Sequence, residues 1–566
     1  MWPLAPSAML FLLGGILLCG EMAEPAGGLL EVTIGAFTEL KLDQASPTEI
    51  LVRNIPQNFS FLLFQVHTQF QNVTLSLSKI PSKNDSDTGS DTGLVTILQP
   101  EQVVCTWYLE SASPKQLVAS AVTIPYTERD PIPGACNLEF SLDVYPNLHL
   151  QYNLYETVIE FAPANLGHAR GQSAPACDVK TDLNSRWRLL YDVYQYFLPE
   201  NNLNESTLLT HLRRMSMVQQ VMANGMKLAT LTSSDLPSVS FASIPGQGVI
   251  YSVIVRDPVL NTSAAYVPVH TYACNFTAAV DNCYTLGKVS TKIFFTFCGL
   301  IGLFLCFFGH RFLKTDFFFV GFVIAGFLMF VLLTRVTQLG YDARLGLTAL
   351  SGVVGGFLLV ASWWRCGSVY ACVLPVGLVL GFLLASVVFF TPIGEYEVFR
   401  DSRVFWMTFS AITAGSVLLL PLPKILNILS CALVGSYTVV LAIDSYLYTS
   451  LSYITLNVLK RALNTEFSAA YTSVPFQTND FIMIALWAVL LVAGAGTQFY
   501  RERERPPFPP TPYLVWKRDR ERRKTNVLDP SYHLPPLKDR VLLRLAQFRE
   551  IFRREQPAGE RTPLLL

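Results

Sequence analysis

The acidic residue best placed for chemistry in this sequence is Asp444, which lies inside the apolar stretch 425–447. A carboxylate is costly to bury in lipid, so it needs a polar partner or a polar cavity. Asp444 is therefore a candidate for a site on an ion or substrate path. The interpretations that we favour are a structural hydrogen bond, or a span whose frame is shifted so that Asp444 approaches the lumenal interface.

The histidines and cysteines do not form a pattern that is typical of an enzyme. A zinc site needs several N, O or S donors that converge, and after residue 290 the only histidines are His310 and His533. The remaining five are scattered, and there is no nucleophile elbow, phosphate loop or metal-spaced Cys/His set. We expect a non-enzymatic protein with no cofactor and no metal.

The pattern Asn-x-Ser/Thr marks candidate N-glycosylation sites. It occurs at Asn58, Asn72, Asn84, Asn204, Asn261 and Asn275, and nowhere after residue 277. This asymmetry predicts that the first half of the chain enters the secretory lumen, so that the protein is a glycoprotein with an extracellular or lumenal N-terminal half.

Of the 11 cysteines, Cys19 should be removed with a signal peptide, and five fall in the ectodomain: Cys105, Cys136, Cys177, Cys274 and Cys283. An oxidising lumen favours disulfide bonds, and an odd number leaves one thiol over. Cys274 with Cys283 is the preferred pair, because the two bracket a short polar stretch. Cys105 with Cys136 is a weaker second pair, and the sequence leaves the connectivity open.

Composition places the chain among membrane proteins. Of 566 residues, 51% are hydrophobic and 15% charged, and the mean hydropathy is +0.36. The balance of 42 basic and 42 acidic residues hides an asymmetry, since residues 21–290 hold 15 basic and 25 acidic residues and residues 501–566 hold 16 and 9. An acidic ectodomain, an apolar block and a basic tail exclude a nucleic-acid-binding protein.

The first 20 residues have the proportions of a signal peptide, with an apolar run at 8–18 that is too short to span a bilayer. The run lacks a preceding Lys or Arg, so an uncleaved membrane anchor is the alternative.

The ectodomain has the two-residue apolar period of half-buried strands, at 73–78, 138–144, 148–154 and 249–255. We expect an all-β ectodomain of two sandwiches, at 21–165 and 186–290, joined by a linker at 166–185. One helix is expected at 203–217.

The segment 291–500 predicts a seven-helix transmembrane domain. The expected spans are 293–309, 317–333, 345–364, 369–390, 404–422, 425–447 and 481–500. An odd number of spans after a lumenal N-terminus places the C-terminus in the cytosol.

Two features of this domain suggest specific packing. Gly352 with Gly356 and Gly377 with Gly381 permit close helix approach, which we interpret as intramolecular rather than as a dimer contact. The long loop 448–480 carries Leu456, Leu459, Leu463 and Phe467 near one helical face, which predicts an amphipathic lumenal helix on the membrane or the bundle, with a ligand-gating lid as the alternative.

Sequence motifs argue against G-protein coupling. The third apolar stretch ends in Trp363-Trp364-Arg365-Cys366 rather than in an acidic-Arg-Tyr triplet, and the seventh contains no proline.

The tail at 501–566 contains a basic cluster and an amphipathic pattern at 537–555, which suits either the anionic lipid surface or the protein's own inner loops. It ends in Glu560-Arg-Thr-Pro-Leu564-Leu565-Leu566, which matches an acidic dileucine sorting motif. Glu560, Leu564 and Leu565 are thus expected to recruit clathrin-adaptor complexes. Residence at the plasma membrane, the late endosome or the lysosome follows.

Long stretches carry a family resemblance, including Tyr126-Thr-Glu-Arg-Asp-Pro-Ile-Pro-Gly-Ala-Cys136 and Leu451-Ser-Tyr-Ile-Thr-Leu-Asn-Val-Leu-Lys-Arg. They resemble the transmembrane 7 superfamily member 3 family of seven-span membrane proteins. The resemblance implies a non-enzymatic glycoprotein that supports cell survival under stress, including protein-folding stress and cytokine-induced death, and secretion such as insulin release. It implies no catalytic residues.

Two further function classes stay open: a transporter or channel that uses Asp444, and a seven-span receptor whose ectodomain binds a ligand or protein partner that the sequence does not identify.

Overall fold

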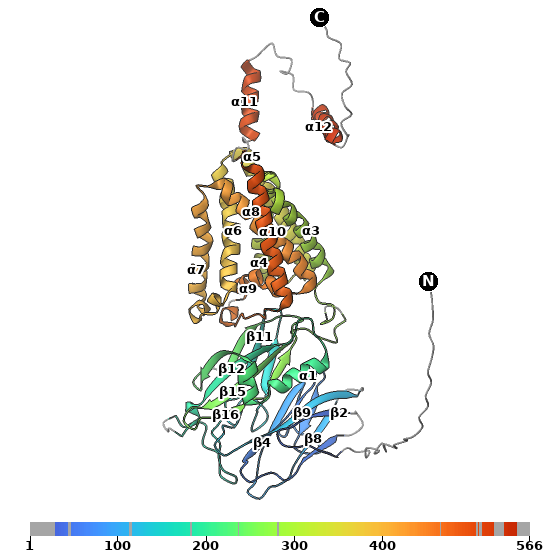
Figure 1. Cartoon of the computed structure of the whole chain (residues 1–566), viewed down its shortest axis with the longest axis vertical. Helices are drawn as coiled ribbons and strands as arrows, with labels where there is room; N and C mark the ends of the chain where they lie inside the picture. The colour runs from blue at the N-terminus through green and yellow to red at the C-terminus, as the bar shows by residue number, and fades with distance from the viewer. Residues whose placement is uncertain are drawn as a thin grey trace, which may run out of the picture. The chain divides into compact units, whose positions relative to one another are not determined.

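The structure is a computed structural model of the whole chain (Figure 1). It describes residues 29–42, 47–111, 116–180, 184–235, 237–279, 282–464, 466–504, 508, 512–525 and 537–551. The predicted signal peptide at 1–20 and the predicted sorting residues Glu560, Leu564 and Leu565 lie outside these ranges. The chain divides into two compact units, one β-rich and one helical.

The β-rich unit begins with a sandwich of two sheets, ordered β1-β3-β8-β5-β6 and β2-β9-β4-β7. Its strands are β1 (Leu29–Glu31), β2 (Phe37–Leu42), β3 (Thr48–Val52), β4 (Phe61–His67), β5 (Val73–Ser76), β6 (Ser86–Gly89), β7 (Asp91–Ile97), β8 (Cys105–Ser111) and β9 (Leu117–Tyr126). Alternate residues face the space between the sheets, where Phe64 stacks on Trp107 with ring centroids 4.8 Å apart. Both side chains are fully buried, which is worth about 1.5–3 kcal/mol for a large apolar side chain.

A second sandwich follows, with sheets ordered β10-β11-β14 and β13-β12-β15-β16, and with β17 paired to β15. Its elements are β10 (Leu148–Tyr152), β11 (Glu156–Phe161), η1 (Arg186–Arg188), β12 (Leu190–Phe197), α1 (Glu205–Arg214), α2 (Val218–Asn224), β13 (Met226–Thr232), β14 (Ser238–Ala242), β15 (Val249–Asp257), β16 (Thr262–Ala265) and β17 (Val269–Thr271). The helix expected at 203–217 is present as α1, and a second short helix, α2, follows it.

The predicted boundary at residue 165 is wrong. β11 pairs antiparallel with β14, so residues 148–161 belong to the second sandwich. The expected linker 166–185 is a crossover within that sandwich, and its Arg170 guanidinium donates to the carbonyls of Phe59 (2.5 Å), Pro56 (2.8 Å) and Gln102 (3.0 Å). The crossover is rich in Gly, Pro, Ala and polar residues, so its composition resembles a linker although Arg170 bonds it to the first sandwich.

The strand expected at 138–144 is also wrong, since this stretch consists of bends. The amide oxygen of Asn137 accepts the backbone N–H groups of Glu139 (3.0 Å) and Phe140 (2.9 Å), and this local turn competes with an extended strand. Phe140 then stacks on Tyr145.

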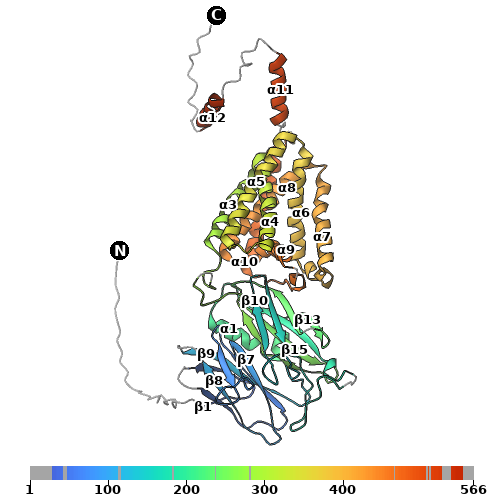
Figure 2. The same cartoon turned by 180° about the vertical axis from the view of Figure 1, so that it is seen from behind.

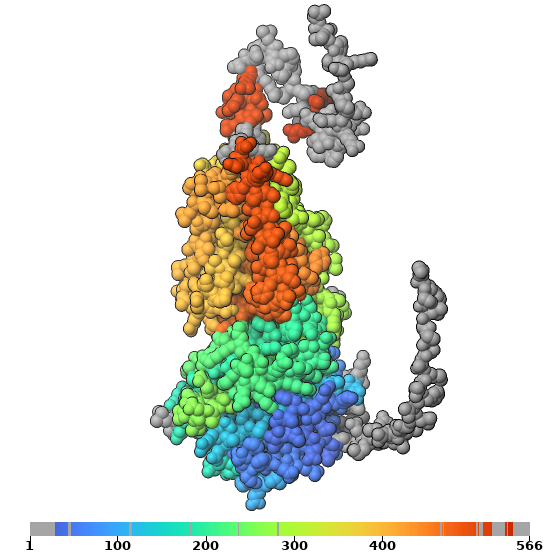
Figure 3. Space-filling model, viewed as in Figure 1, coloured from blue at the N-terminus to red at the C-terminus, as the bar shows by residue number. Residues whose placement is uncertain are grey.

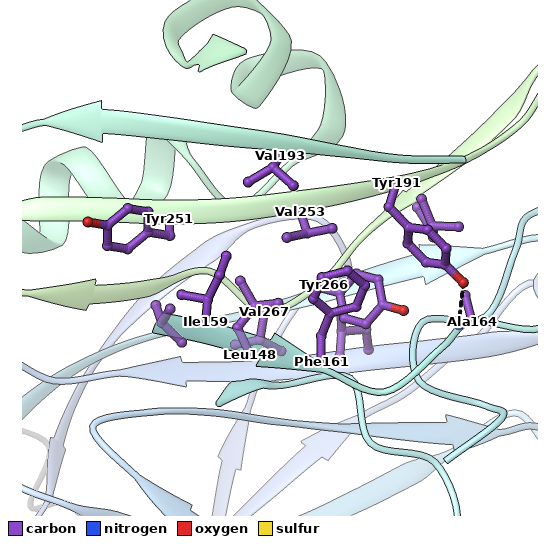
Figure 4. Close-up of a cluster of buried hydrophobic side chains, with 14 of the residues drawn as sticks. Leu148, Ile159, Phe161, Ala164, Tyr191, Val193, Tyr251, Val253, Tyr266 and Val267 are labelled. Carbon is purple, nitrogen blue, oxygen red and sulfur yellow. Dashed lines mark hydrogen bonds between the residues drawn. The ribbon is translucent and has the colours of Figure 1, made fainter. Parts of the chain in front are cut away.

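One apolar cluster joins the two sandwiches. Phe61 and Val122 of the first sandwich belong to the same buried cluster as Phe161 and Tyr251 of the second. Figure 4 shows part of this cluster. The ring centroids of Phe161 and Tyr191 lie 5.3 Å apart, and the Tyr191 hydroxyl accepts a hydrogen bond from the Ala164 N–H at 3.0 Å. The two sandwiches therefore share a hydrophobic core and belong to one compact unit.

The helical unit supplies seven helices long and apolar enough to span a membrane, counted over the described residues. They are α3 (Val289–Phe308), α4 (Leu313–Val336), α5 (Tyr341–Cys366), α6 (Val369–Phe390), α7 (Ser402–Gly415) continued by η4 (Ser416–Leu419), α8 (Pro423–Leu447) and α10 (Thr478–Glu502). Each matches a predicted span, and the chain is a multi-pass membrane protein with a β ectodomain. On α10, which lies at the outside of the helical unit in Figure 3, Val489 is 65% and Val492 71% exposed, as suits a lipid-facing surface.

The paired glycines lie where helices approach closely. α4 and α5 run side by side (Figure 2), and a Cβ at Gly352 or Gly356 would meet the carbonyl oxygens of Phe322 or Phe318. Gly381 of α6 faces the Thr413 carbonyl oxygen of α7. These contacts are intramolecular. Beyond α10 the tail contains α11 (Pro512–Thr525) and α12 (Leu537–Ile551).

Candidate functional site

The segment between α8 and α10, residues 448–477, is hereafter called the connector. It contains η5 (Ser450–Ser452), α9 (Tyr453–Leu463) and η6 (Glu466–Ala469), and it belongs to the same compact unit as the two sandwiches. The expected amphipathic helix is therefore present. Its buried face differs from the expected one, however, because α9 buries Ile454, Val458 and Arg461 and leaves Leu456, Leu459 and Leu463 half-buried.

The connector extends the edge of a β-sheet. The Tyr471 N–H donates to the Ser240 carbonyl at 2.9 Å, and the Tyr471 carbonyl accepts the Ala242 N–H at 2.8 Å. Tyr471 thereby forms a parallel bridge with Phe241 in β14. An open sheet edge presents unpaired backbone groups, and this bridge covers them.

Two side chains further along extend the contact to β12. The Ser473 hydroxyl donates to the Gln195 amide oxygen at 2.8 Å. The Gln477 amide donates to the Leu198 carbonyl at 2.9 Å, and its oxygen accepts the Glu200 N–H at 2.5 Å. The connector is thus bonded to both sheets of the second sandwich.

Lys460 is a buried cation in this interface. Only 4% of it is exposed, and its Nζ donates to the Ser243 carbonyl just after β14 at 2.9 Å. The Tyr453 ring lies 5.0 Å from Nζ and the Phe467 ring 5.5 Å, at cation–π distance. Among the described residues no carboxylate forms an ion pair with Lys460, and burial lowers its pKa from 10.5 to about 7.

Arg461 and Arg400 bring the α6–α7 loop to the same place. Arg461 donates to the Phe399 carbonyl at 3.0 Å and lies 4.2 Å from the Phe405 ring, while Arg400 lies 3.9 Å from the Tyr471 ring. The loop contains η2 (Pro392–Glu395) and η3 (Glu397–Arg400). Burial and the neighbouring Arg400 lower the pKa of Arg461 from 12.5 to about 10.

Two carboxylates attach the connector to the membrane helices. Asp444, three residues before the end of α8, accepts a hydrogen bond from the Thr449 hydroxyl. Asp480, in the first turn of α10, accepts the Ser450 N–H at 2.6 Å and the Gln477 N–H at 3.0 Å. The position and partner of Asp444 favour the structural hydrogen bond over a site on a transport path.

The disulfides differ in part from the expected ones. Cys274 is joined to Cys283, whereas Cys136 is joined to Cys177 and not to Cys105. The Cys105–Cys136 pairing is wrong because Cys105 is a free thiol buried in β8 beside the sandwich core. The crossover places Cys177 next to Cys136, a proximity that strand order alone does not predict.

The six sequon asparagines, Asn58, Asn72, Asn84, Asn204, Asn261 and Asn275, are all exposed. Each could accept a glycan without disturbing the core.

A second polar cluster lies between the two sandwiches. Asp91 is bonded through one carboxylate oxygen to His67 Nδ1 and through the other to His270 Nδ1, both at 2.7 Å. His270 Nε2 lies 2.7 Å from the Gln69 carbonyl. The cluster contains no nucleophile, and no group of three or more His, Cys, Asp or Glu in the described ranges could hold a metal ion.

The residues that sequence reasoning missed are Lys460, Arg461 and Asp480. The sequence does show that Lys460 and Arg461 interrupt an apolar helical face. It does not show that they are buried, because their burial depends on contacts such as that of Lys460 with Ser243, just after β14. Asp480 is an acidic residue in the first turn of a helix, a common arrangement that does not by itself indicate a function. Its two hydrogen-bond partners, Ser450 and Gln477, lie in the connector.

Three family models match the chain. Residues 28–126 match a "TM7SF3-like, N-terminal immunoglobulin-like domain", residues 131–277 a "TM7SF3-like, second immunoglobulin-like domain", and residues 295–499 a "TM7S3/TM198-like domain". The two sandwiches are thus Ig-like domains, divided near residue 130.

Curated relatives match along nearly the whole chain. Transmembrane 7 superfamily member 3 of Mus musculus is 59% identical over 545 residues, 96% of each chain, and that of Homo sapiens is 58% identical over 540 residues, 95% of each chain. The protein of the same name from Rattus norvegicus is 58% identical over 545 residues, 96% of each chain.

Proposed function

Since the chain belongs to the transmembrane 7 superfamily member 3 family, we propose that it is a non-enzymatic membrane regulator whose second Ig-like domain controls helices α8 and α10 through the connector. The observation that supports this most is the backbone bridge between Tyr471 and β14. A ligand or partner of the Ig-like domains that shifts β14 also shifts the connector. Because Asp444 and Asp480 hold the two ends of the connector, the shift reaches both helices.

The cellular role that we propose is protection against stress, including protein-folding stress and cytokine-induced death, together with support of secretion such as insulin release. The support for this role is the family resemblance. The Ig-like pair is the expected partner-binding part, and its partner is a protein or ligand outside the cell or in the lumen.

A backbone substitution in the connector tests the proposal. Tyr471→Pro removes the N–H that donates to Ser240, whereas Tyr471→Ala keeps both backbone bonds and removes only the ring. In cells that lack the endogenous protein, Tyr471→Ala should restore survival under folding stress, and Tyr471→Pro should not, at matched surface abundance. Equal rescue by both variants would contradict the proposed route.

We further propose that the N-terminus is lumenal or extracellular, the chain glycosylated, and the basic tail cytosolic at the membrane lipid surface. The exposed positions of all six sequon asparagines support glycosylation. Enzymatic removal of N-linked glycans from intact cells should reduce the apparent mass of the protein. An unchanged mass in a sextuple Asn→Gln variant would refute this orientation.

Sorting to late endosomes or lysosomes, in addition to the plasma membrane, is proposed to depend on clathrin adaptors that bind Glu560, Leu564 and Leu565. A Leu564→Ala, Leu565→Ala double variant should accumulate at the cell surface by surface labelling. Wild-type distribution of that variant would show that the motif is inert.

A transporter that uses Asp444 is the alternative function, and the Thr449 hydrogen bond is an observation against it. Asp444→Asn keeps a side-chain oxygen that can accept the Thr449 hydroxyl, so the connector stays attached to α8 and stress protection should remain intact under our proposal. The same variant should abolish stress protection if transport through the Asp444 carboxylate is the function.

A further inference from the structure

A group of buried polar side chains lies inside the helical unit, away from the connector. It consists of His310 in the α3–α4 turn, Asp316 in the first turn of α4, Asn427 and Cys431 in α8, and Gln498 in α10. Each is at most 4% exposed. Charged and polar residues buried inside a membrane domain are rare and often functional.

Hydrogen bonds connect most of these groups. The Asn427 amide donates to His310 Nδ1 at 3.3 Å and approaches Cys431 Sγ at 3.5 Å. Gln498 accepts the His310 backbone N–H at 3.0 Å and donates to the Cys306 carbonyl at 2.7 Å. The carboxyl of Asp316 is in hydrogen-bond contact with Cys431 and Asn427.

Two oxygen atoms of the group remain without a donor. Asp316 Oδ2 and Asn427 Oδ1 are buried and have no hydrogen-bond partner in the described structure. Asp316 also forms no ion pair with a described Lys or Arg. Its titratable neighbour is the thiol of Cys431, and Asn427, which contacts the carboxyl, is bonded in turn to the imidazole of His310. A buried ionised carboxylate without a cation costs several kcal/mol.

A cation must therefore compensate Asp316. A metal ion needs several converging donors, and the described residues contain no group of three or more His, Cys, Asp or Glu that could hold one. A proton needs only one oxygen. It removes the charge and turns Oδ2 from an acceptor without a donor into a donor.

We propose that Asp316 is an exchangeable proton-binding site within the helical unit, with Asn427 and His310 as its polar connection to the α3–α4 turn. Water supplies the proton: the carboxylate and a hydronium ion give the carboxylic acid and water. Asn427 donates to His310 Nδ1, so the polar groups continue from Asp316 to the α3–α4 turn. The site is independent of the connector and of the function proposed above.

The test is infrared difference spectroscopy of the full-length protein in phosphatidylcholine nanodiscs near neutral pH. The spectrum of wild type minus Asp316→Asn should contain the C=O stretch of one protonated carboxylic acid, which shifts on transfer to D2O. Asp342→Asn, which changes an exposed acid at the start of α5, should leave that band in place. An ionised carboxylate band in place of the acid band would overturn the proposal, because Asp316 would then serve only as a charge at the start of α4.

A second variant guards against misfolding of Asp316→Asn. Asn427→Leu removes a hydrogen-bond partner of the carboxyl, so the acid band should shift without being lost. A band at the wild-type position in Asn427→Leu would contradict the assignment. The spectra should be the same in sodium chloride and choline chloride, and an acid band that appears only without sodium would show that the site holds a metal cation instead.

Discussion

His270 and Asp91 form a buried ion pair between the two Ig-like domains, because both ring nitrogens of His270 face atoms that can only accept. Nδ1 lies 2.7 Å from Asp91 Oδ2, and Nε2 lies 2.7 Å from the Gln69 carbonyl oxygen. The imidazole must therefore carry two protons and a positive charge. His67 donates to the other Asp91 oxygen, so the carboxylate has a donor on each side.

This pair predicts a stability maximum in mild acid. Burial alone would raise the pKa of Asp91, but His270 and His67 lower it from 3.8 to about 2. Burial alone would lower the pKa of His270, but Asp91 and the Gln69 carbonyl raise it above 6.5. The Asp91 contribution is complete above 3.8 and is lost as the pH falls through about 2, while the His270 contribution is complete below 6.5 and is lost as the pH rises through its folded pKa.

The matching experiment is thermal unfolding of the full-length protein across pH. His270→Gln should lose about 3–5 kcal/mol near pH 5, because it leaves Asp91 buried without its cation, and the loss should shrink at alkaline pH. His149→Gln, which changes a half-buried histidine outside the pair, should change little. A pH-independent effect of His270→Gln would show that the ring is neutral.

Lys460 predicts the opposite dependence on pH. Its folded pKa of about 7 lies below the usual 10.5, so the folded state binds fewer protons than the unfolded state between these values. Stability of the connector interface should therefore rise with pH from about 7 to about 10.5 and should not change below 7 on account of this residue. Lys460→Met, which keeps the apolar stem, should abolish that rise in a thermal unfolding series. A rise that persists in the variant would place its origin elsewhere.

The sequence predicted elements better than it predicted pairings. Long apolar runs identified all seven spans. The alternation of apolar and polar residues identified β5, β10 and β15, because a strand with one buried face places an apolar residue at every second position. The domain boundary failed because β11 pairs with β14 across about 75 intervening residues. Lys460 and Asp316 were missed for a related reason: whether a charged residue is buried depends on the partner surface, as with Ser243 for Lys460.

Close packing of α6 on α7 predicts that Gly381 tolerates no side chain. A Cβ there would meet the Thr413 carbonyl oxygen, so Gly381→Ala should destabilise the helical unit by about 1–3 kcal/mol. Gly346→Ala on α5 is the control, since nothing lies within 4 Å of its Cβ position, and it should be neutral or gain up to about 1 kcal/mol. Melting temperatures in nanodiscs measure both, and equal effects would refute the α6–α7 contact.

The disulfide between Cys136 and Cys177 spans 41 residues. Chain entropy gives a stabilisation of about 4 kcal/mol for a loop of that length, so Cys136→Ser should lower the stability of the Ig-like pair by an amount of that order. Cys105→Ala should cost much less, since that thiol is unpaired. Urea unfolding of the full-length protein compares them. A larger loss in Cys105→Ala than in Cys136→Ser would mean that the pairing is different in solution.

The coupling of the Ig-like domains to α8 and α10 is tested most directly by hydrogen exchange of the full-length protein in nanodiscs, comparing wild type, Tyr471→Pro and Tyr471→Ala. Exchange should rise in Tyr471→Pro along β14 and the connector and also at the end of α8 and the start of α10, where Asp444 and Asp480 hold the connector. Tyr471→Ala should resemble wild type in these segments. If Tyr471→Pro loosens β14 and the connector while both helix ends exchange as in wild type, the connector does not transmit the state of the Ig-like domains to the membrane helices.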